Sequence, residues 1–242
     1  MITRTQQLSY APDDRPGSEH PTPRLDRIAP LSGVVFAVLA MAGYLTIGEF
    51  PDEQTPVSTL STFYAAHHAQ VGRGGVMLGY SVIFFIFFGA TIWARIRRTA
   101  AAPVLAAAAL LGAALTASDL MGASGYYATL GVIGGRPGTT PAALQAWHIA
   151  GATGNVSAGA IVLIVAVAAA ALTARAFPLW LALSGLVLVA LQFTPMSFLS
   201  WLLMHAWILV TSITMALRPI VQRPAATPGS VDRLSDASVA HG

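Results

Sequence analysis

The chain has 242 residues, of which 55% are hydrophobic and only 10% charged, and it contains no cysteine. Soluble domains average about 25% charged residues, so this composition excludes a soluble enzyme, a nucleic-acid-binding domain and a disordered chain. The lack of cysteine excludes a disulfide scaffold, a thiolate nucleophile, an iron–sulfur cluster and a Cys-ligated zinc. The class that remains is an all-α, polytopic membrane helical bundle.

Both ends of the chain are polar and differ sharply from its middle. Residues 1–27 hold eight charges and four prolines, and residues 218–242 are rich in Ala, Pro and Ser. Such segments bury too little apolar surface to fold alone. The sequence therefore predicts two disordered tails around a membrane domain of residues 28–217.

Six apolar stretches inside this domain, uncharged apart from Asp119, have about the length that crosses a bilayer, which takes about 20 helical residues. They cover residues 28–48, 75–94, 101–133, 141–174, 178–193 and 196–217. The third and fourth are longer than a bilayer requires. They predict a helical hairpin that protrudes on the outer side, turns at residues 134–138, and has Thr140 as the N-cap and Pro141 in the first turn of its second helix.

The arginines predict the orientation, because cationic side chains accumulate on the cytoplasmic side of membrane proteins. All 13 cationic residues are arginines, and six spans with the N-terminus inside leave only Arg73 and Arg136 outside. The other eleven then lie on the inner side: Arg4, Arg15, Arg24, Arg27, Arg95, Arg97, Arg98, Arg175, Arg218, Arg223 and Arg233. We therefore expect an N-in/C-in protein of the bacterial cytoplasmic membrane that anchors to anionic lipid headgroups.

The loop between the first two spans carries an amphipathic pattern over residues 57–70. Its apolar face consists of Leu60, Phe63, Tyr64, His67 and Val71, spaced as on one side of a helix. We expect a short amphipathic helix that lies on the outer interface or caps the bundle, with His67 on the apolar face and the neighbouring His68 towards water.

Asp119 is the only acidic residue between residues 99 and 135. A carboxylate at membrane depth is costly and therefore indicates a functional position, although its place near the outer boundary also allows a plain interfacial role. At that level Arg73 begins the second span, so an ion pair between Asp119 and Arg73 is the simpler interpretation.

The predicted hairpin places polar side chains opposite one another. With a turn centred on Pro137, Asp119 lies level with Asn155 and Tyr126 level with His148. Small residues between them allow close approach of the two helices. We therefore expect a polar seam along this pair of helices, which acts either as polar packing between helices or as part of a site.

His205 in the sixth span completes the candidate set. All members fall in the outer half of the bundle, so a ligand site would open outwards: Arg73, Asp119, Tyr126, His148, Asn155 and His205. No metal-binding or nucleophile motif is present, and no cofactor is expected. The pattern favours a non-enzymatic binding or accessory protein for a lipid or small molecule, without nucleic acid. The alternative is a metal-dependent intramembrane hydrolase that uses Asp119, His148 and His205.

Several segments resemble a family of actinobacterial six-span membrane proteins that is known only as a domain of unknown function. They are RIAPLSGVVFAVLAMAGYL, EFPDEQTP, STLSTFYAAHHAQV, TPAALQAWHIAGATGNV and FPLWLALSGLVLV, and the resemblance covers about residues 25–217. It implies a multi-pass protein of the cytoplasmic membrane and assigns no activity and no functional residues.

Overall fold

The computed structural model describes residues 28–52, 54–99, 101–152, 157–194 and 197–218. All regular structure in these ranges is helical. The elements are η1 (Ala29–Leu31), α2 (Ser32–Ile47), α3 (Val57–Arg97), α4 (Pro103–Gly134), α5 (Pro141–Ala152), α6 (Ala158–Ala174), α7 (Leu179–Gln192) and α8 (Ser197–Leu217). The two predicted tails lie outside the described residues, apart from Arg218.

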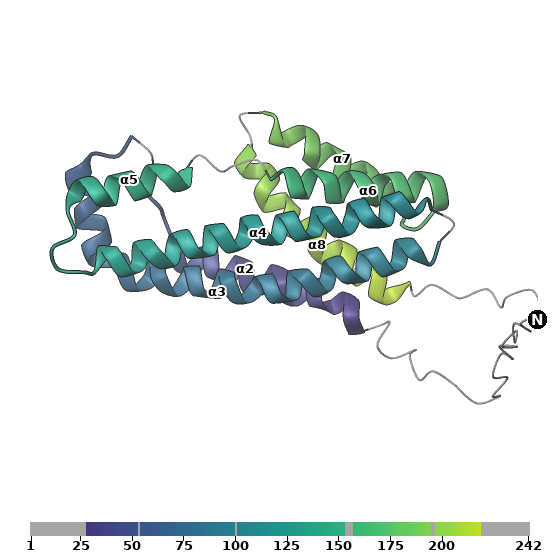
Figure 1. The fold of residues 1–242 in the computed structure, drawn as a ribbon, viewed down its shortest axis with the longest axis horizontal. Helices are drawn as coiled ribbons and strands as arrows, with labels where there is room; N and C mark the ends of the chain where they lie inside the picture. Colours follow the sequence, from purple (N-terminus) through teal and green to yellow (C-terminus); the bar gives the residue numbers. More distant parts are fainter. Residues whose placement is uncertain (1–27, 53, 100, 153–156, 195–196, 219–242) are drawn as a thin grey trace, which may run out of the picture.

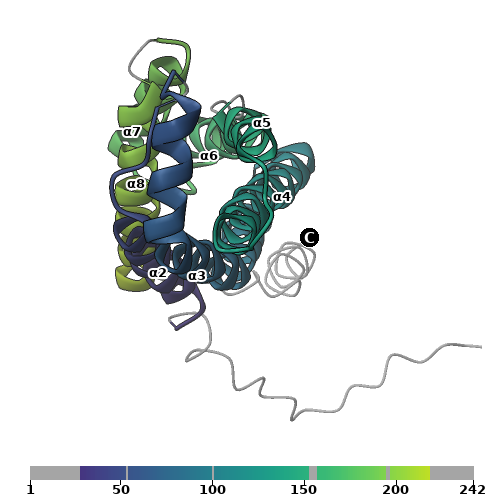
Figure 2. The same ribbon diagram turned by 90° about the vertical axis from the view of Figure 1, so that its left-hand side faces the viewer.

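Six of these helices form a closed ring in chain order. Helix α2 packs on α3, α3 on α4, α4 on α6, α6 on α7 and α7 on α8, and α8 closes the ring by packing on α2. The first and last described helices, η1 and α8, also touch. We call the end of the bundle where the described chain begins and ends the terminal end, and the opposite end, which carries α5, the distal end (Figures 1 and 2).

Helices α3 and α4 are the longest elements and extend past the rest of the ring at the distal end (Figure 1). They have 41 and 32 residues, and α4 is roughly 48 Å long at 1.5 Å per residue. The segment predicted as a short amphipathic helix, residues 57–70, is helical and forms the first part of α3. Its first turns lie across the distal end of the bundle, while the rest of α3 runs along it (Figure 2). Gly72, Gly74 and Gly75 do not interrupt the helix, since they serve to bring α2 and α4 close to it.

The glycines of α3 and α4 allow the two backbones to approach closely. A Cβ at Gly75 would lie 2.5 Å from the Ala128 nitrogen, and a Cβ at Gly131 would collide with Gly72. The Ser124 hydroxyl crosses the same interface and donates a 2.8 Å hydrogen bond to the Gly75 carbonyl oxygen. Small residues in these positions are typical of helix pairs in membranes.

The predicted long helix over residues 141–174 is replaced by two helices, α5 and α6. Ser157 has an extended backbone, and its hydroxyl accepts a hydrogen bond from the Ala160 amide at 3.1 Å, which makes it the N-cap of a new helix. The start of the hairpin's second helix is confirmed, since the Ala143 amide donates to the Thr140 hydroxyl, and Pro141 opens α5.

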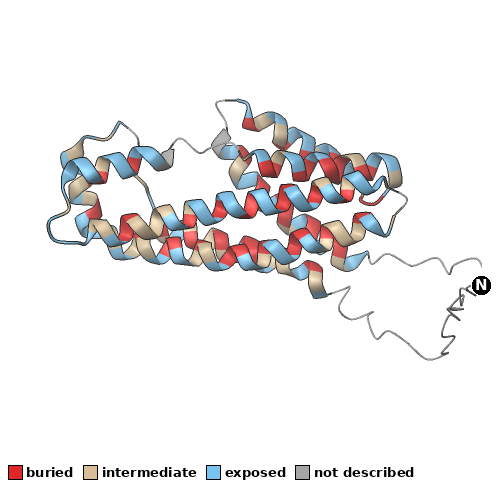
Figure 3. Cartoon of the chain, in the orientation of Figure 1, coloured by how far each residue is buried: buried red, intermediate tan, exposed pale blue. Residues whose placement is uncertain are grey.

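Buried and exposed residues alternate along the helices, and many exposed residues are large and apolar (Figure 3). Alanines occupy much of the interior, among them Ala40, Ala109 and Ala170, while Phe87, Leu111 and Val187 are each about 60% exposed. Contiguous apolar surface of this kind is rare on soluble monomers and normal in contact with lipid. Four helices in the described part are long and apolar enough to cross a membrane, namely residues 29–47, 57–97, 103–134 and 199–217, and α6 and α7 are shorter apolar helices. The described part of the chain is therefore all-helical, with the long apolar helices of a membrane protein.

Replacement of Gly75 by Ala should destabilise the bundle by about 1–3 kcal/mol, because the new methyl group meets the α4 backbone. Gly125→Ala is the matched control, since nothing lies within 4 Å of a Cβ there, and removal of a mid-helix glycine is worth about 0.5–1 kcal/mol in favour of the helix. Thermal unfolding in detergent measures both. Equal melting temperatures for the two variants would contradict the close α3–α4 contact.

Candidate functional site

His148 lies at the centre of an aromatic group at the distal end of the bundle. Its side chain is 2% exposed and stacks on Phe50 with a ring separation of 5.2 Å. We call this group the distal aromatic cluster, and its members are Phe50, Phe63, Tyr64, Tyr126, Tyr127 and His148. It joins α3, α4 and α5 to the segment that follows α2.

Both ring nitrogens of His148 have hydrogen-bond partners. Nε2 lies 3.0 Å from the Asp52 carbonyl oxygen, and Nδ1 lies 3.0 Å from the Tyr64 hydroxyl. A carbonyl oxygen only accepts, so Nε2 carries a proton and donates a hydrogen bond to Asp52. Because both ring nitrogens have partners, neither is left for a metal ion, and His148 serves to connect three segments of the chain.

Tyr126 and His148 lie at the same level, as the hairpin geometry predicts. The contact is different from the predicted one, because the Tyr126 hydroxyl donates to the His148 carbonyl oxygen at 3.0 Å and not to its ring. The ring points instead towards Tyr64 on α3. The sequence pattern places Tyr64 on the apolar face of its helix. It does not predict the contact with His148, because the two residues are 84 positions apart in the chain.

Asp119 is exposed on α4 and is bound to the start of α6. The Ser157 hydroxyl donates a 2.6 Å hydrogen bond to the Asp119 carboxylate. The carboxylate thereby lies beside the N-terminus of α6, where the helix dipole favours negative charge. Asn155, its predicted partner, lies outside the described residues. Ser157 comes two residues after it in the sequence.

Asp119 also faces a cavity of about 850 Å³ between α4 on one side and α2 and α8 on the other. We call it the distal cavity. Its lining combines two carboxylates with aromatic and aliphatic side chains, and includes Tyr44, Leu45, Glu49, Phe50, Asp119, Leu120, Tyr127, Ser157, Trp201, Leu202 and Met204. Tyr44 and Trp201 meet edge to face with their ring centroids 4.0 Å apart. No Arg occurs among the described residues of the lining.

The expected ion pair between Arg73 and Asp119 is wrong. Helices α3 and α4 pair so that Gly72 lies against Gly131 and Gly89 against Ala113. Asp119 therefore lies about ten residues, or roughly 15 Å, further along the bundle than Arg73. Arg73 is exposed, and its Nε donates to the Ala69 carbonyl oxygen one turn earlier in its own helix.

The two adjacent histidines of α3 have the reverse of their predicted environments. His67 is exposed and stacks on Phe63, with Nδ1 3.0 Å from the Phe63 carbonyl oxygen. His68 is half-buried and lies against Gly134 and Gly135 at the end of α4. The sequence pattern predicts which face of the helix is apolar, but it does not predict what packs there. In the structure the end of α4 covers His68 and leaves His67 exposed.

His205 is 2% exposed inside the bundle, outside the lining of the distal cavity. Its ring stacks on Phe36 at 5.5 Å and packs against Trp201, whose carbonyl oxygen lies 3.0 Å from Nδ1. Nε2 is buried without a hydrogen-bond partner. His205 and His148 thus occupy separate surroundings, and no group of three His, Asp or Glu side chains that could hold a metal occurs in the described ranges.

The structure brings together some of the candidate residues and adds others. Asp119 lines the distal cavity, while Tyr126 and His148 belong to the adjoining distal aromatic cluster. The aromatic lining residues Tyr44, Tyr127 and Trp201 come from three different helices, and no local sequence pattern links them. Comparison of the chain with protein-family models, with curated proteins and with solved structures finds no match.

Tyr64→Phe should loosen the attachment of α5, because it leaves the buried Nδ1 of His148 without its hydrogen-bond partner, which costs about 1–3 kcal/mol. We expect a lower melting temperature and faster amide hydrogen exchange in α5. Tyr80→Phe on the same helix is the control, since Tyr80 is 62% exposed. Unchanged exchange in α5 of the Tyr64 variant would show that this hydrogen bond does not hold the helix.

Proposed function

We propose that the chain crosses the bacterial cytoplasmic membrane six times, with both termini inside. The closed ring supports six spans, because the shorter helices α6 and α7 complete it between α4 and α8. Five of the seven described arginines lie at the terminal end, and two, Arg73 and Arg136, lie towards the distal end. The distal end is then the outer side, and α3, α4 and α5 form a protrusion there. The resemblance to actinobacterial six-span proteins agrees with this topology.

The function we propose is the non-enzymatic binding of a small lipophilic organic cation in the distal cavity. The observation that supports it is the lining: the carboxylates of Asp119 and Glu49 beside the rings of Tyr44, Tyr127 and Trp201. Aromatic faces attract cations, and the attraction grows where water is displaced. The volume of about 850 Å³ falls within the usual range of small-molecule sites, which is about 300–1,000 Å³.

The lining favours binding over catalysis. The Asp119 carboxylate already accepts a hydrogen bond from Ser157. The two candidate histidines also have hydrogen-bond partners: His148 contacts Tyr64 and Asp52, and His205 contacts Trp201. A general base must reach the proton that it removes, and these contacts hold the histidines outside the cavity. The carboxylate is therefore suited to neutralise the charge of a ligand.

The topology is tested with single cysteines, since the natural chain has none. Pro137→Cys, in the α4–α5 connection, should react with a membrane-impermeant maleimide in intact cells. Ala102→Cys and Thr173→Cys, at the other ends of α4 and α6, should react only after permeabilisation. Thr173→Cys decides between six and four spans, because labelling of this residue in intact cells would mean that α6 does not cross.

Ligand binding is tested with tetraphenylphosphonium and tetraphenylborate, two ions of similar shape and opposite charge, by equilibrium dialysis in a neutral detergent. The cation should bind. Asp119→Asn should weaken this binding by about tenfold through the loss of one charged contact, although the amide oxygen can still accept the hydrogen bond from Ser157. Ala123→Trp, which fills the cavity, should abolish binding.

Met121→Trp is the control for the added ring, since Met121 lies two residues away, is 53% exposed and does not line the cavity. Equal binding of the two ions, or unchanged binding by Ala123→Trp, would contradict the proposal.

A further inference from the structure

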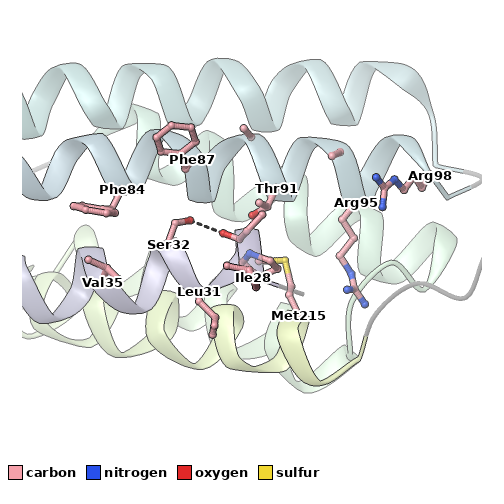
Figure 4. A pocket seen from close by; sticks show the side chains of 14 residues that line it. Ile28, Leu31, Ser32, Val35, Phe84, Phe87, Thr91, Arg95, Arg98 and Met215 are labelled. Carbon is pink, nitrogen blue, oxygen red and sulfur yellow. Dashed lines mark hydrogen bonds between the residues drawn. The ribbon is translucent and has the colours of Figure 1, made fainter. Parts of the chain in front are cut away.

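A second hollow, of about 550 Å³, lies at the terminal end of the bundle between the start of the described chain and α3. We call it the terminal groove. Figure 4 shows Val35, Phe84 and Phe87 along one part of it and Arg95 and Arg98 at its other end. Its apolar residues face outwards, with Ile28 61% and Phe87 60% exposed. The groove therefore combines an apolar body, open to the surroundings of the bundle, with a cationic end.

The length of the groove matches half of a membrane. Phe84 and Arg95 are eleven residues apart on α3, which is about 16 Å along the helix axis. The hydrocarbon core of a bilayer is about 30 Å thick, so one leaflet contributes about 15 Å. With Arg95 at the headgroup level, Phe84 lies close to the bilayer midplane. An acyl chain of one leaflet has this length.

The cationic end is held in place by the fold. Arg95 donates from Nε to the Ala176 carbonyl oxygen at 2.8 Å and from Nη1 to the Arg218 carbonyl oxygen at 2.9 Å, and it lies over the Phe177 ring at 5.4 Å. Arg95 is also shared with a neighbouring hollow, of about 490 Å³, that Arg175 and Arg218 line. Four arginines thus surround adjoining hollows at one level of the bundle.

Three carboxylates occur in the described ranges, and none of them lines the terminal groove. Glu49 and Asp119 line the distal cavity, and Asp52 lies beside His148. A guanidinium group binds phosphate oxygens through two parallel hydrogen bonds, which makes arginine the side chain suited to a phosphate in this position.

We propose that the terminal groove is a binding site for one anionic phospholipid of the adjacent leaflet. Its phosphate lies against Arg95 and Arg98, and one acyl chain lies along the apolar part of the groove past Phe87 to Phe84. The charge selects the headgroup, and the groove selects a molecule with a chain over a free anion. This site is independent of the distal cavity and of the ligand proposed there.

The test is native mass spectrometry of the full chain in a neutral detergent, with dioleoyl-phosphatidylglycerol or dioleoyl-phosphatidylcholine added. We expect the anionic lipid to bind at least tenfold more tightly, and 10 mM inorganic phosphate to leave it bound. Arg98→Gln should weaken the anionic lipid several-fold, and Ala90→Trp should displace it, because Ala90 is an exposed residue that lines the groove and its replacement leaves every arginine in place.

Arg97→Gln is the matched control. Arg97 lies at the same level and carries the same charge, but its guanidinium stacks on Trp93 at 4.8 Å and does not line the groove. Binding should stay within twofold of the natural chain. The proposal is overturned if Arg97→Gln weakens binding as much as Arg98→Gln, if Ala90→Trp leaves binding unchanged, if inorganic phosphate displaces the lipid, or if the two lipids bind equally. Arg95 is left unchanged because it holds the ends of two other segments together.

Discussion

The arrangement of the bundle depends on the close approach of two backbones, those of α3 and α4. Their glycines remove the side chains that would hold the helices apart, from Gly72 and Gly131 near the distal end to Gly89 nearer the terminal end. Water-driven burial contributes little between helices in lipid, so van der Waals contact over a long interface has to supply the attraction. This contact holds the long part of α3 against α4, and the first turns of α3, with Tyr64, lie across the distal end of the bundle beside α5 (Figure 2).

The same pair of helices separates two kinds of chemistry. The distal end contains carboxylates and tyrosines, and the distal aromatic cluster around His148 ties α5 to it. The terminal end contains arginines, of which Arg95 binds the carbonyl oxygens of two other segments. These carboxylates and the arginines of the terminal end are thus separated along the bundle, and few other charges lie between them, because an isolated charge is expensive in hydrocarbon.

Most helix bounds could be predicted from the sequence, because charges and prolines mark where apolar stretches end. Pro103, Pro141 and Pro178 each stand at or just before a helix start. The continuity of α3 could not be predicted, since Gly72 and Gly75 weaken a helix unless a partner packs against them. The prediction of one long helix over residues 141–174 takes no account of Ser157, a good N-cap residue, at which α6 begins in the structure. The distal cavity depends on how α2, α4 and α8 meet, which no local pattern contains.

The unbroken course of α3 has a consequence for how this protein can change in length. Each residue of a helix adds 1.5 Å and a turn of about 100°. A single insertion in the middle of α3 would therefore rotate Tyr64 away from His148 and shift Gly72 off Gly131. Only a change of about seven residues, close to two full turns, made in both α3 and α4, restores the contacts. Length variation among relatives of this chain should accordingly be concentrated in the connections and absent from this helix pair.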